Sequence, residues 1–332
     1  MRQGHLVDRF NRIATNLRVS VTDICNLRCT YCMSEDMQFI DESKIMTFDE
    51  IDQLIRVAVS LGVDKVRITG GEPLVRRGLS DLISKVIKID GIKDVSLTTN
   101  GIGLAKQAQA LYDVALRLIY VSLDTLSKAK FQQITRREAL EKVLEGLEEA
   151  KRCGFDPIKI NAVAMRGFTE EEVVNLVSFA RENSYEMRFI EFMPLDADDI
   201  WGRNMFVPKK ELVDKITKLY PLEPVKSSSK LKHETAKHYQ FKDGLGKVGF
   251  ISSVSEPFCD DCNRVRLTAD GKFRNCLFAT DETDLLTELR KGASNEVIAK
   301  MMIESVANKE AGHLINSVDF VKPERNMSMI GG

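Results

Sequence analysis

Short apolar runs alternate with amphipathic stretches through the first two thirds of the chain. The apolar runs predict strands over 17–22, 65–69, 95–98, 118–122, 158–163 and 187–191. Between them, 3.6-residue periodicity predicts helices over 48–61, 79–89, 104–111, 140–152 and 170–182. Thr47, with Glu50 three residues later, is typical of a capping box at the first helix.

Most of these strands recur about every 25 to 40 residues, the rhythm of βα units with a parallel sheet. Six units are fewer than a closed eight-fold barrel needs. We therefore expect an α/β fold with an open, partial (βα)6-type barrel. An open doubly wound sheet is the competing arrangement.

The pattern changes after about residue 200. Short strands are predicted over 248–253, 265–268 and 272–274, followed by helices over 284–291 and 294–302. Residues 221–224 read as a turn and 227–229 as a polar loop, whereas 321–332 read as an extended tail. We expect two domains, a barrel over 1–200 and a C-terminal α+β extension over 201–332.

Composition narrows the class of protein. The chain has 332 residues, with 48 basic and 49 acidic side chains and a net charge of −1, so no charge surplus indicates nucleic acid or a membrane surface as a partner. No apolar run approaches the roughly 18 residues of a membrane span, and the N-terminus lacks a secretory signal pattern. Seven cysteines, an odd number, fit a reducing compartment, so we expect a cytoplasmic protein.

Three of the cysteines, Cys25, Cys29 and Cys32, follow the first predicted strand. If the segment turns helically, steps of four and three residues place all three on one face. Three thiolates can hold three irons of a [4Fe–4S] cube and leave the fourth iron without a protein ligand. Zinc or buried thiols are the alternatives, but structural zinc usually takes four ligands and no histidine lies near this loop.

A second trio consists of Cys259, Cys262 and Cys276. This spacing is compatible with zinc or with another iron–sulfur cluster, and spacing alone slightly favours zinc. His233 and His238, more than 20 residues upstream, are candidates for a fourth ligand. The seventh cysteine, Cys153, ends a helix and is expected to be a neutral thiol.

Two further patterns stand beside these trios. Arg264 and Arg266 point to the same side of a predicted strand, which suits a polyanion such as a triphosphate or, equally, a solvated surface pair. Gly70-Gly71-Glu72-Pro73 ends a strand, where glycines permit a ligand to approach the backbone. A plain tight turn is the alternative.

The segment from Val21 to Cys32, with Tyr31 directly before the third cysteine, resembles the CxxxCxΦC loop of the radical S-adenosylmethionine superfamily. Gly70-Gly71-Glu72-Pro73 resembles that family's GGEP element, and Ser122-Leu123-Asp124 a further one, in which the serine reaches the ribose. A helix N-cap is the alternative role for Ser122. The resemblance implies that S-adenosylmethionine completes the first cluster and is cleaved by one electron to a 5′-deoxyadenosyl radical.

A closer resemblance covers the chain from about Leu17 to its end. The CxxCxRxRL pattern at Cys259, the 65–74 and 97–101 segments, Arg188–Met193 and the closing diglycine are similar to the molybdenum-cofactor biosynthesis protein A family, the GTP 3′,8-cyclases. In place of zinc, this resemblance implies a second [4Fe–4S] cluster on Cys259, Cys262 and Cys276, whose open iron meets the guanine of GTP.

The resemblance also implies the ligand contacts. Those to S-adenosylmethionine fall on Tyr31, Gly71, Ser122 and Met193. Those to GTP fall on Arg18, Arg67, Thr98, Lys159, Arg264, Val265 (through its backbone) and Arg266. The tail residues Gly331 and Gly332 are implied to insert toward the same pocket and to be needed for turnover. No catalytic side chain is implied beyond the clusters and the cofactor.

The implied enzyme is a lyase of molybdenum cofactor biosynthesis. The radical abstracts H3′ of GTP, and C3′ attacks guanine C8 to give 3′,8-cyclo-7,8-dihydro-GTP. Expected partners are an electron donor such as flavodoxin or ferredoxin and, for the product, cyclic pyranopterin monophosphate synthase. The chain is expected to be a monomer or a homodimer. The competing functions are a peptide-modifying enzyme of the same superfamily and a diglycine-tailed sulfur carrier.

Overall fold

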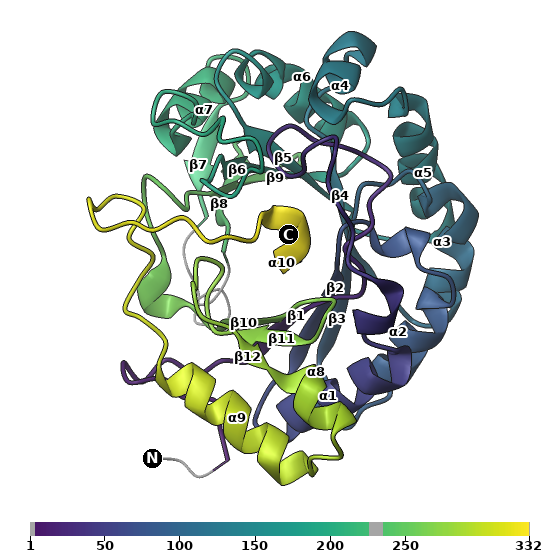
Figure 1. Cartoon of the computed structure of the whole chain (residues 1–332). Helices are drawn as coiled ribbons and strands as arrows, with labels where there is room; N and C mark the ends of the chain where they lie inside the picture. The colour runs from purple at the N-terminus through teal and green to yellow at the C-terminus, as the bar shows by residue number, and fades with distance from the viewer. Residues whose placement is uncertain (1–3, 226–234, 332) are drawn as a thin grey trace.

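A parallel sheet forms the first part of the chain in the computed structural model, which describes residues 4–225 and 235–331. Six strands pair in chain order, namely β1 (Asn16–Ser20), β2 (Lys65–Thr69), β3 (Asp94–Thr99), β4 (Leu118–Ser122), β5 (Lys159–Ala164) and β6 (Glu186–Glu191). Outside them lie α1 (Phe48–Ser60), α2 (Leu79–Ile87), α3 (Leu104–Asp113), α4 (Lys128–Thr135), α5 (Leu140–Cys153) and α6 (Thr169–Glu182) (Figure 1).

The rest of the chain extends this sheet at both edges. Next to β6 come β9 (Lys247–Ile251), β8 (Lys237–Phe241) and β7 (Leu222–Pro224), and next to β1 come β10 (Arg264–Leu267), β11 (Lys272–Arg274) and β12 (Thr283–Asp284). Both β9 and β10 are parallel to their neighbours, and the outer strands are antiparallel. In the described ranges no pairing joins β7 to β12, so the barrel stays open.

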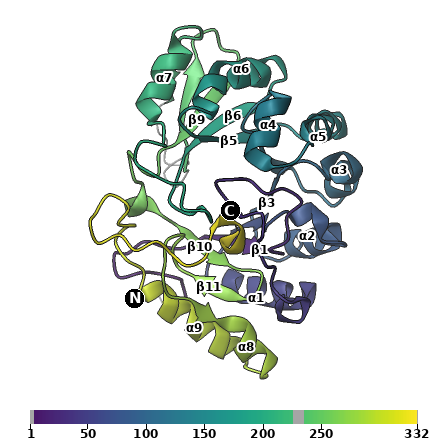
Figure 2. The ribbon, with the colours of Figure 1, turned by 45° about the horizontal axis from the view of Figure 1, so that its top comes forward.

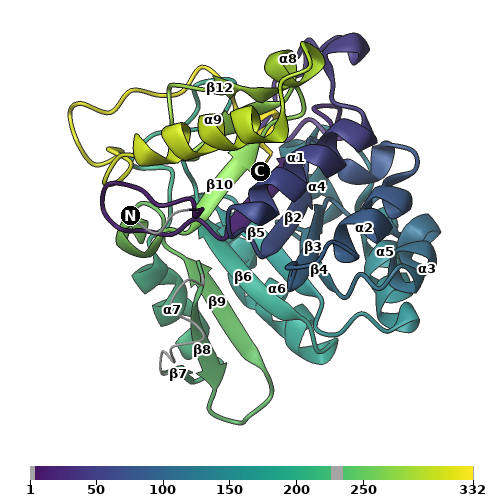
Figure 3. The same ribbon diagram turned by 90° about the horizontal axis from the view of Figure 1, so that it is seen from below.

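The observed architecture confirms the open partial barrel with an α+β extension. The extension also carries α7 (Lys209–Thr217), α8 (Leu285–Arg290) and α9 (Asn295–Ala307), and α9 packs beside α1 (Figure 3). Short 3₁₀ turns occur at Glu42–Lys44, Pro73–Val75 and Cys259–Asp261. A domain boundary at residue 200 stays a prediction, since one sheet contains strands from both sides of that position.

Along each strand of the barrel, side chains alternate between the core under the helices and the interior of the barrel. On β1, Leu17 and Val19 belong to the hydrophobic core under the helices, while Arg18 lines the barrel interior. The same alternation puts Val66 and Ile68 outward and Arg67 and Thr69 inward on β2. Apolar packing therefore fixes the sheet from outside, and polar side chains are left to line the inside.

Several predicted elements were wrong or missing. Residues 222–224 form the edge strand β7 rather than a turn, because an edge position tolerates a proline that cannot donate. Two helices, α4 and α7, were missed, and Ser127, not Ser122, is the N-cap of α4. The tail is not fully extended, since α10 (Met327–Ile330) forms one turn capped by Asn326. The polar loop at 227–229 lies outside the described residues.

The capping box predicted at the first helix is present. The Thr47 hydroxyl accepts from the Glu50 N–H, and the Glu50 carboxylate accepts from the Thr47 N–H. Among the described residues, none of the helices combines the length and apolarity that crossing a bilayer requires.

A close approach between α3 and α5 depends on Gly146. A Cβ at this position would lie 2.5 Å from the carbonyl oxygen of Gly101 and 3.1 Å from the Cβ of Leu104. Backbone atoms cannot move aside as a flexible side chain would, so the glycine sets the distance between this helix and the turn that begins α3.

We predict that Gly146→Ala destabilises the protein, although alanine is the better helix former by about 1 kcal/mol. Overpacking against backbone typically costs about 1–3 kcal/mol and should prevail. Denaturant unfolding of Gly146→Ala should give a lower free energy of unfolding than that of Glu145→Ala, a matched change at an exposed neighbouring position. Equal or higher stability of Gly146→Ala would contradict the close approach.

Candidate active site

Both cysteine trios line one cavity at the mouth of the barrel. The first trio follows β1 in the chain, and the second precedes β10 and follows β11. The C-terminal turn α10 lies between β1 and β6 (Figure 2). The cavity is lined by Arg18, Cys25, Cys29, Tyr31, Cys32, Arg67, Gly71, Thr98, Ser122, Arg188, Met193, Cys259, Cys262, Arg264, Arg266 and Cys276, among others. The fold therefore brings the two predicted metal sites to one shared cavity.

The first trio lies on a loop with one helical turn, over Cys29–Cys32, rather than on the continuous helical segment predicted for all three cysteines. A turn brings the Cys32 and Met33 N–H groups to the carbonyl of Cys29, each at 2.9 Å. Arg28 and Thr30 donate their N–H groups to the carbonyls of Thr135 and Ile134, so the end of α4 supports the loop. Tertiary contacts rather than helical periodicity gather the three thiols.

Gly70 and Gly71 are needed because the cysteine loop passes directly over them. A Cβ on Gly70 would lie 2.7 Å from the Thr22 carbonyl oxygen, and one on Gly71 would clash with the carbonyls of Asp23 and Ile24. The backbone instead forms sheet-like hydrogen bonds, from Gly71 N to Thr22 O at 2.7 Å and from Glu72 N to Ile24 O at 2.8 Å. The Gly-Gly pair therefore sets the position of the loop.

Glu72 links this turn to the end of β3. Its buried carboxyl accepts hydrogen bonds from the Leu74 N–H, the Thr99 hydroxyl and the Asn100 N–H, at 2.6–2.9 Å. Burial raises the pKa of Glu72 to about 7, although these three donors lower it. Asn100 in turn donates to Asn26 beside Cys25, so the GGEP turn, β3 and the cysteine loop form one unit.

The contacts implied for S-adenosylmethionine all belong to the same cavity. Tyr31, Gly71, Ser122 and Met193 all line it. The Tyr31 hydroxyl donates to Asp124 at 2.7 Å, and Asp124 also accepts from the Val163 N–H at 2.7 Å. Burial raises the pKa of Asp124 to about 6. Tyr31 is thus held by the Asp124 carboxyl, which β5 supports through the Val163 N–H.

The second trio is assembled from two separate places. Cys259 and Cys262 flank the short turn before β10, and Cys276 follows β11. Arg12, from the N-terminal segment, donates to the carbonyl of Cys259 at 2.9 Å and to that of Ala311 at 2.6 Å. This arginine ties together the beginning of the chain, the second trio and the segment after α9.

Two cations lie against Cys262. Lys309, although buried, places its ammonium 3.4 Å from the Cys262 sulfur and 3.0 Å from the Arg264 carbonyl, and Arg264 Nη2 lies 3.4 Å from the same sulfur. Burial raises the pKa of the Cys262 thiol, but these two charges lower it by more than burial raises it. The resulting pKa is about 6. Burying an ammonium is costly unless a negative group faces it, so this position is built for a thiolate.

The trios fit clusters better than single metal ions. Within residues 4–225 and 235–331, no three His, Cys, Asp or Glu side chains converge on a point that one metal ion could occupy. Zinc needs such convergence, since each sulfur lies about 2.3 Å from it. In a [4Fe–4S] cube each thiolate binds a different iron, so the thiols can stand farther apart. The second trio is compatible with the cluster that the resemblance implies.

Of the two histidines considered as a fourth ligand, only His238 is described, and it contacts Glu186. His238 lies at the other end of the barrel, with its Nε2 3.1 Å from the carboxylate of Glu186. His233 lies outside the described residues.

Three arginines from adjacent strands form one layer inside the barrel. Strand register aligns Arg266 of β10 with Arg18 of β1, and Arg18 with Arg67 of β2. Burial lowers the pKa of Arg18, and repulsion from Arg266, Arg67 and Arg264 lowers it further. Burial and Arg264 likewise lower the pKa of Arg266 to about 9. Such crowding of like charges favours binding of a polyanion.

The inner face of β4, β5 and β6 continues this positive layer around Tyr120. The guanidinium carbon of Arg67 lies 3.8 Å, and that of Arg188 5.2 Å, from the centroid of the Tyr120 ring. Lys159 lies 5.5 Å from the same ring and 3.9 Å from the Glu186 carboxylate. In the described structure, the buried Nε atoms of Arg18 and Arg188 have no hydrogen-bond partner, as expected of donors that await a ligand.

Two implied GTP contacts do not line the cavity through their side chains. Val265 packs outward into the core, which is compatible with the backbone contact implied for it. Lys159 sits deeper, next to Tyr120 and Glu186.

The tail enters the cavity. Gly331, with φ +78°, accepts a hydrogen bond from Arg266 Nη1 at 2.6 Å, and a Cβ there would lie 2.6 Å from Thr69 Oγ1. Gly332 lies outside the described residues.

Sequence reasoning missed three residues of this site. Arg188 was quoted only as part of a motif, although its alternation with buried Met187 and Phe189 could have identified it as an inward cation. Lys309 and His313 belong to the segment after α9 and carry no local signal. His313 lines the cavity and packs on Phe278 with ring centroids 5.2 Å apart.

Two protein-family models match successive parts of the chain. The Radical SAM superfamily model matches residues 19–180, and the Molybdenum Cofactor Synthesis C model matches residues 185–315. The fold is similar to that of Streptococcus suis SuiB bound to S-adenosylmethionine, with a TM-score of 0.62 at 15% identity over 95% of this chain and 78% of that one. Native anSMEcpe with bound AdoMet gives a TM-score of 0.58 at 16% identity, over 90% of this chain and 82% of that one.

The fold and the first cysteine loop thus define the radical S-adenosylmethionine class, to which S-adenosylmethionine and a [4Fe–4S] cluster belong. Over nearly its whole length the chain is similar to curated relatives. It is 45% identical to GTP 3′,8-cyclase of Streptomyces coelicolor, over 98% of this chain and 96% of that protein, and 40% identical to GTP 3′,8-cyclase of Alkaliphilus oremlandii, over 98% and 99%. The chain belongs to the GTP 3′,8-cyclase family.

We predict that the two trios differ in thiol reactivity once iron is removed. At pH 7 Cys262 is mostly thiolate, whereas burial raises the pKa of Cys25 to about 11 and that of Cys32 to about 12. Because the thiolate is the nucleophile, iodoacetamide should alkylate Cys262 first, and its rate should fall as the pH is lowered through about 6. Peptide mass mapping of chelator-treated protein measures this order.

Lys309→Met should slow alkylation of Cys262 several-fold at pH 7, because one of the two charges that favour the thiolate is lost. Lys300→Met, on the exposed side of α9, is the matched control and should leave the rate unchanged. Alkylation of Cys25 or Cys32 ahead of Cys262 would contradict the electrostatics described.

Proposed function

We propose that this protein is a GTP 3′,8-cyclase that catalyses the first step of molybdenum cofactor biosynthesis. The observation that carries the proposal is one cavity with a three-cysteine site at each side and a crowded layer of cations between them. The names of the curated relatives support the same activity.

The cations bind the triphosphate. Arg18, Arg264 and Arg266 offer guanidinium groups that can bind phosphate oxygens in pairs, and Arg67 and Lys159 extend the positive surface along β2 and β5. Because these charges repel one another, a bound polyanion relieves repulsion already present in the protein. Thr98 and the Val265 backbone contact the remainder of the nucleotide.

The cysteines hold two [4Fe–4S] clusters, one on Cys25, Cys29 and Cys32 and one on Cys259, Cys262 and Cys276. A cluster held by the first trio would supply one electron to bound S-adenosylmethionine, which would break into methionine and a 5′-deoxyadenosyl radical. Abstraction of H3′ of GTP would give 5′-deoxyadenosine and a C3′ radical, and its addition to guanine C8 would leave a radical on the base. One further electron from the external electron donor and one proton would then give 3′,8-cyclo-7,8-dihydro-GTP. The second trio presents the guanine base. Lys309 and Arg264 compensate the negative charge of its thiolates.

Other residues position the cofactor and exclude water. Tyr31, Gly71, Ser122 and Met193 contact S-adenosylmethionine, and Asp124 fixes the Tyr31 ring through its hydroxyl. The tail closes the mouth of the barrel with Gly331 beside Arg266. Closure matters because a carbon radical survives only where stray hydrogen donors are kept away.

The partners follow from this chemistry. A small electron carrier such as flavodoxin or ferredoxin supplies the electron, and cyclic pyranopterin monophosphate synthase receives the product. Both clusters need a reducing compartment, so we place the protein in the cytoplasm, acting as a monomer or a homodimer.

The proposal is tested with anaerobically reconstituted protein, GTP, S-adenosylmethionine and dithionite. We expect 5′-deoxyadenosine and the cyclised nucleotide to form together, and Cys25→Ser to form neither. Cleavage of S-adenosylmethionine that leaves GTP intact would overturn the proposal and favour a peptide-modifying enzyme. Unchanged activity of Cys25→Ser would contradict a cluster on the first trio, and a wild-type protein that forms neither compound would favour a carrier.

We predict that Arg266→Ala lowers kcat/KM for GTP by about 10- to 100-fold, the usual loss for a charge-assisted contact, while both clusters keep their iron. Arg266→Lys should recover only part of the loss, because a lysine cannot bind phosphate in pairs. Arg9→Ala, at an exposed site, is the control. Wild-type turnover of Arg266→Ala at low GTP would remove Arg266 from the site.

A further inference from the structure

The C-terminal tail leaves an exposed loop and becomes buried over residues 323–330. Val318 is fully exposed and Val321 is 65% exposed, whereas Ser328 is 2% and Ile330 is 0% exposed. Arg325 lies at the transition, with its side chain only 15% exposed. What holds this point of entry decides whether the following residues stay in the barrel.

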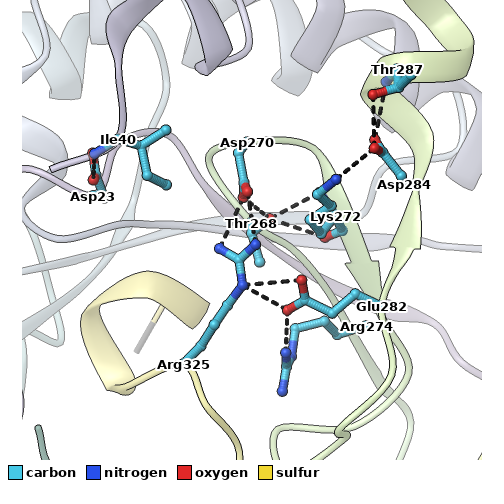
Figure 4. A network of polar contacts seen from close by, with 10 residues as sticks. All are labelled: Asp23, Ile40, Thr268, Asp270, Lys272, Arg274, Glu282, Asp284, Thr287 and Arg325. Atoms are coloured by element: carbon cyan, nitrogen blue, oxygen red, sulfur yellow. Dashed lines mark hydrogen bonds and ion pairs between the residues drawn. The ribbon is translucent and has the colours of Figure 1, made fainter.

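Arg325 is bound by two carboxylates from the β10–β12 region. Its Nη1 and Nη2 donate to both oxygens of Asp270, at 3.1 and 2.7 Å, and its Nε donates to Glu282 at 3.0 Å (Figure 4). Both carboxylates are largely buried, with 15% and 19% of their side chains exposed. This is the planar, two-oxygen geometry that a guanidinium recognises best.

The carboxylates are themselves fixed. Asp270 accepts from the Thr268 hydroxyl at 2.6 Å, and Glu282 also accepts from Arg274. Arg274 is buried and stands opposite Arg266 in the β10–β11 register, on the strand that leads to Cys276. The tail is therefore anchored to the same two strands that carry the second trio and one of the cations.

Beyond Arg325 the tail reaches both sides of the cavity. Met327 N–H donates to the Leu195 carbonyl at 2.9 Å, and Asn326 caps α10. Burial raises the pKa of Cys32, and hydrogen bonds from the backbone and hydroxyl of Ser328 lower it, so Ser328 lies against the first trio. Gly331 meets Arg266 at the opposite side.

We propose that Arg325 is a positioning residue, and that its clasp with Asp270 and Glu282 holds residues 326–331 in the mouth of the barrel. Its importance for turnover rests on the proposed function; the placement of the tail does not. Arg325 acts through Gly331 and α10, because its own guanidinium is fully engaged with the two carboxylates.

Hydrogen exchange of the full-length protein tests the placement without any assay of turnover. In Arg325→Ala, exchange of the C-terminal peptide covering 326–331 should quicken by at least about tenfold, the effect of losing a charge-assisted pair. Asp270→Asn should have the same direction, and Arg325→Lys should lie between. Lys322→Ala removes a cation that binds Asp196 and Asp199 in the preceding loop, and it should leave the peptide protected.

Unchanged exchange of the tail in Arg325→Ala would overturn the proposal. So would a rise that spreads to the peptides of β10 and β11, since Arg325 would then support the hairpin rather than the tail.

Turnover provides a second, separate measurement. We expect Arg325→Ala to lower kcat by about tenfold or more with KM for GTP within about threefold, because the phosphate-binding cations remain in place. A loose tail with unchanged kcat would refute the role in turnover. A wild-type protein that makes no cyclised nucleotide would refute the proposed function, while the exchange measurement would still decide the clasp.

Discussion

Repulsion among buried cations is the constraint on which the site depends. The sheet places Arg266, Arg18 and Arg67 side by side. The Tyr120 ring next to Arg67 and the Glu186 carboxylate next to Lys159 offset part of this positive charge. Such an interior is tolerated because apolar packing outside the strands fixes the barrel independently. The positive interior is balanced when anionic ligands, thiolates and a triphosphate, are present.

This constraint connects the two halves of the chain. The first half supplies Arg18, Arg67 and one trio, and the second supplies Arg264, Arg266 and the other trio on a strand that completes the same sheet. Neither half encloses the cavity alone. The C-terminal tail contacts both halves, because Ser328 hydrogen-bonds Cys32 and Gly331 accepts a hydrogen bond from Arg266.

Much of this could be predicted from local sequence, and the reason is the strength of local signals. The bounds of β2 and β4 follow directly from their apolar runs, and the capping box fixes the start of α1. The cysteine trios and the Gly-Gly turn also carry recognisable spacing. What could not be predicted depends on distant partners: the clasp joins Arg325 to residues 55 and 43 positions away, and Lys309 meets Cys262 across 47 positions.

The most direct measurement of the central claim is iron content together with electron paramagnetic resonance, recorded with and without GTP. We expect roughly eight irons per chain and a GTP-induced change in the signal of the cluster on Cys259, Cys262 and Cys276. Serine replacement of that trio should remove half of the iron and abolish the change. One tightly bound zinc at this trio, or a signal that GTP leaves unaltered, would contradict two open metal sites facing one substrate.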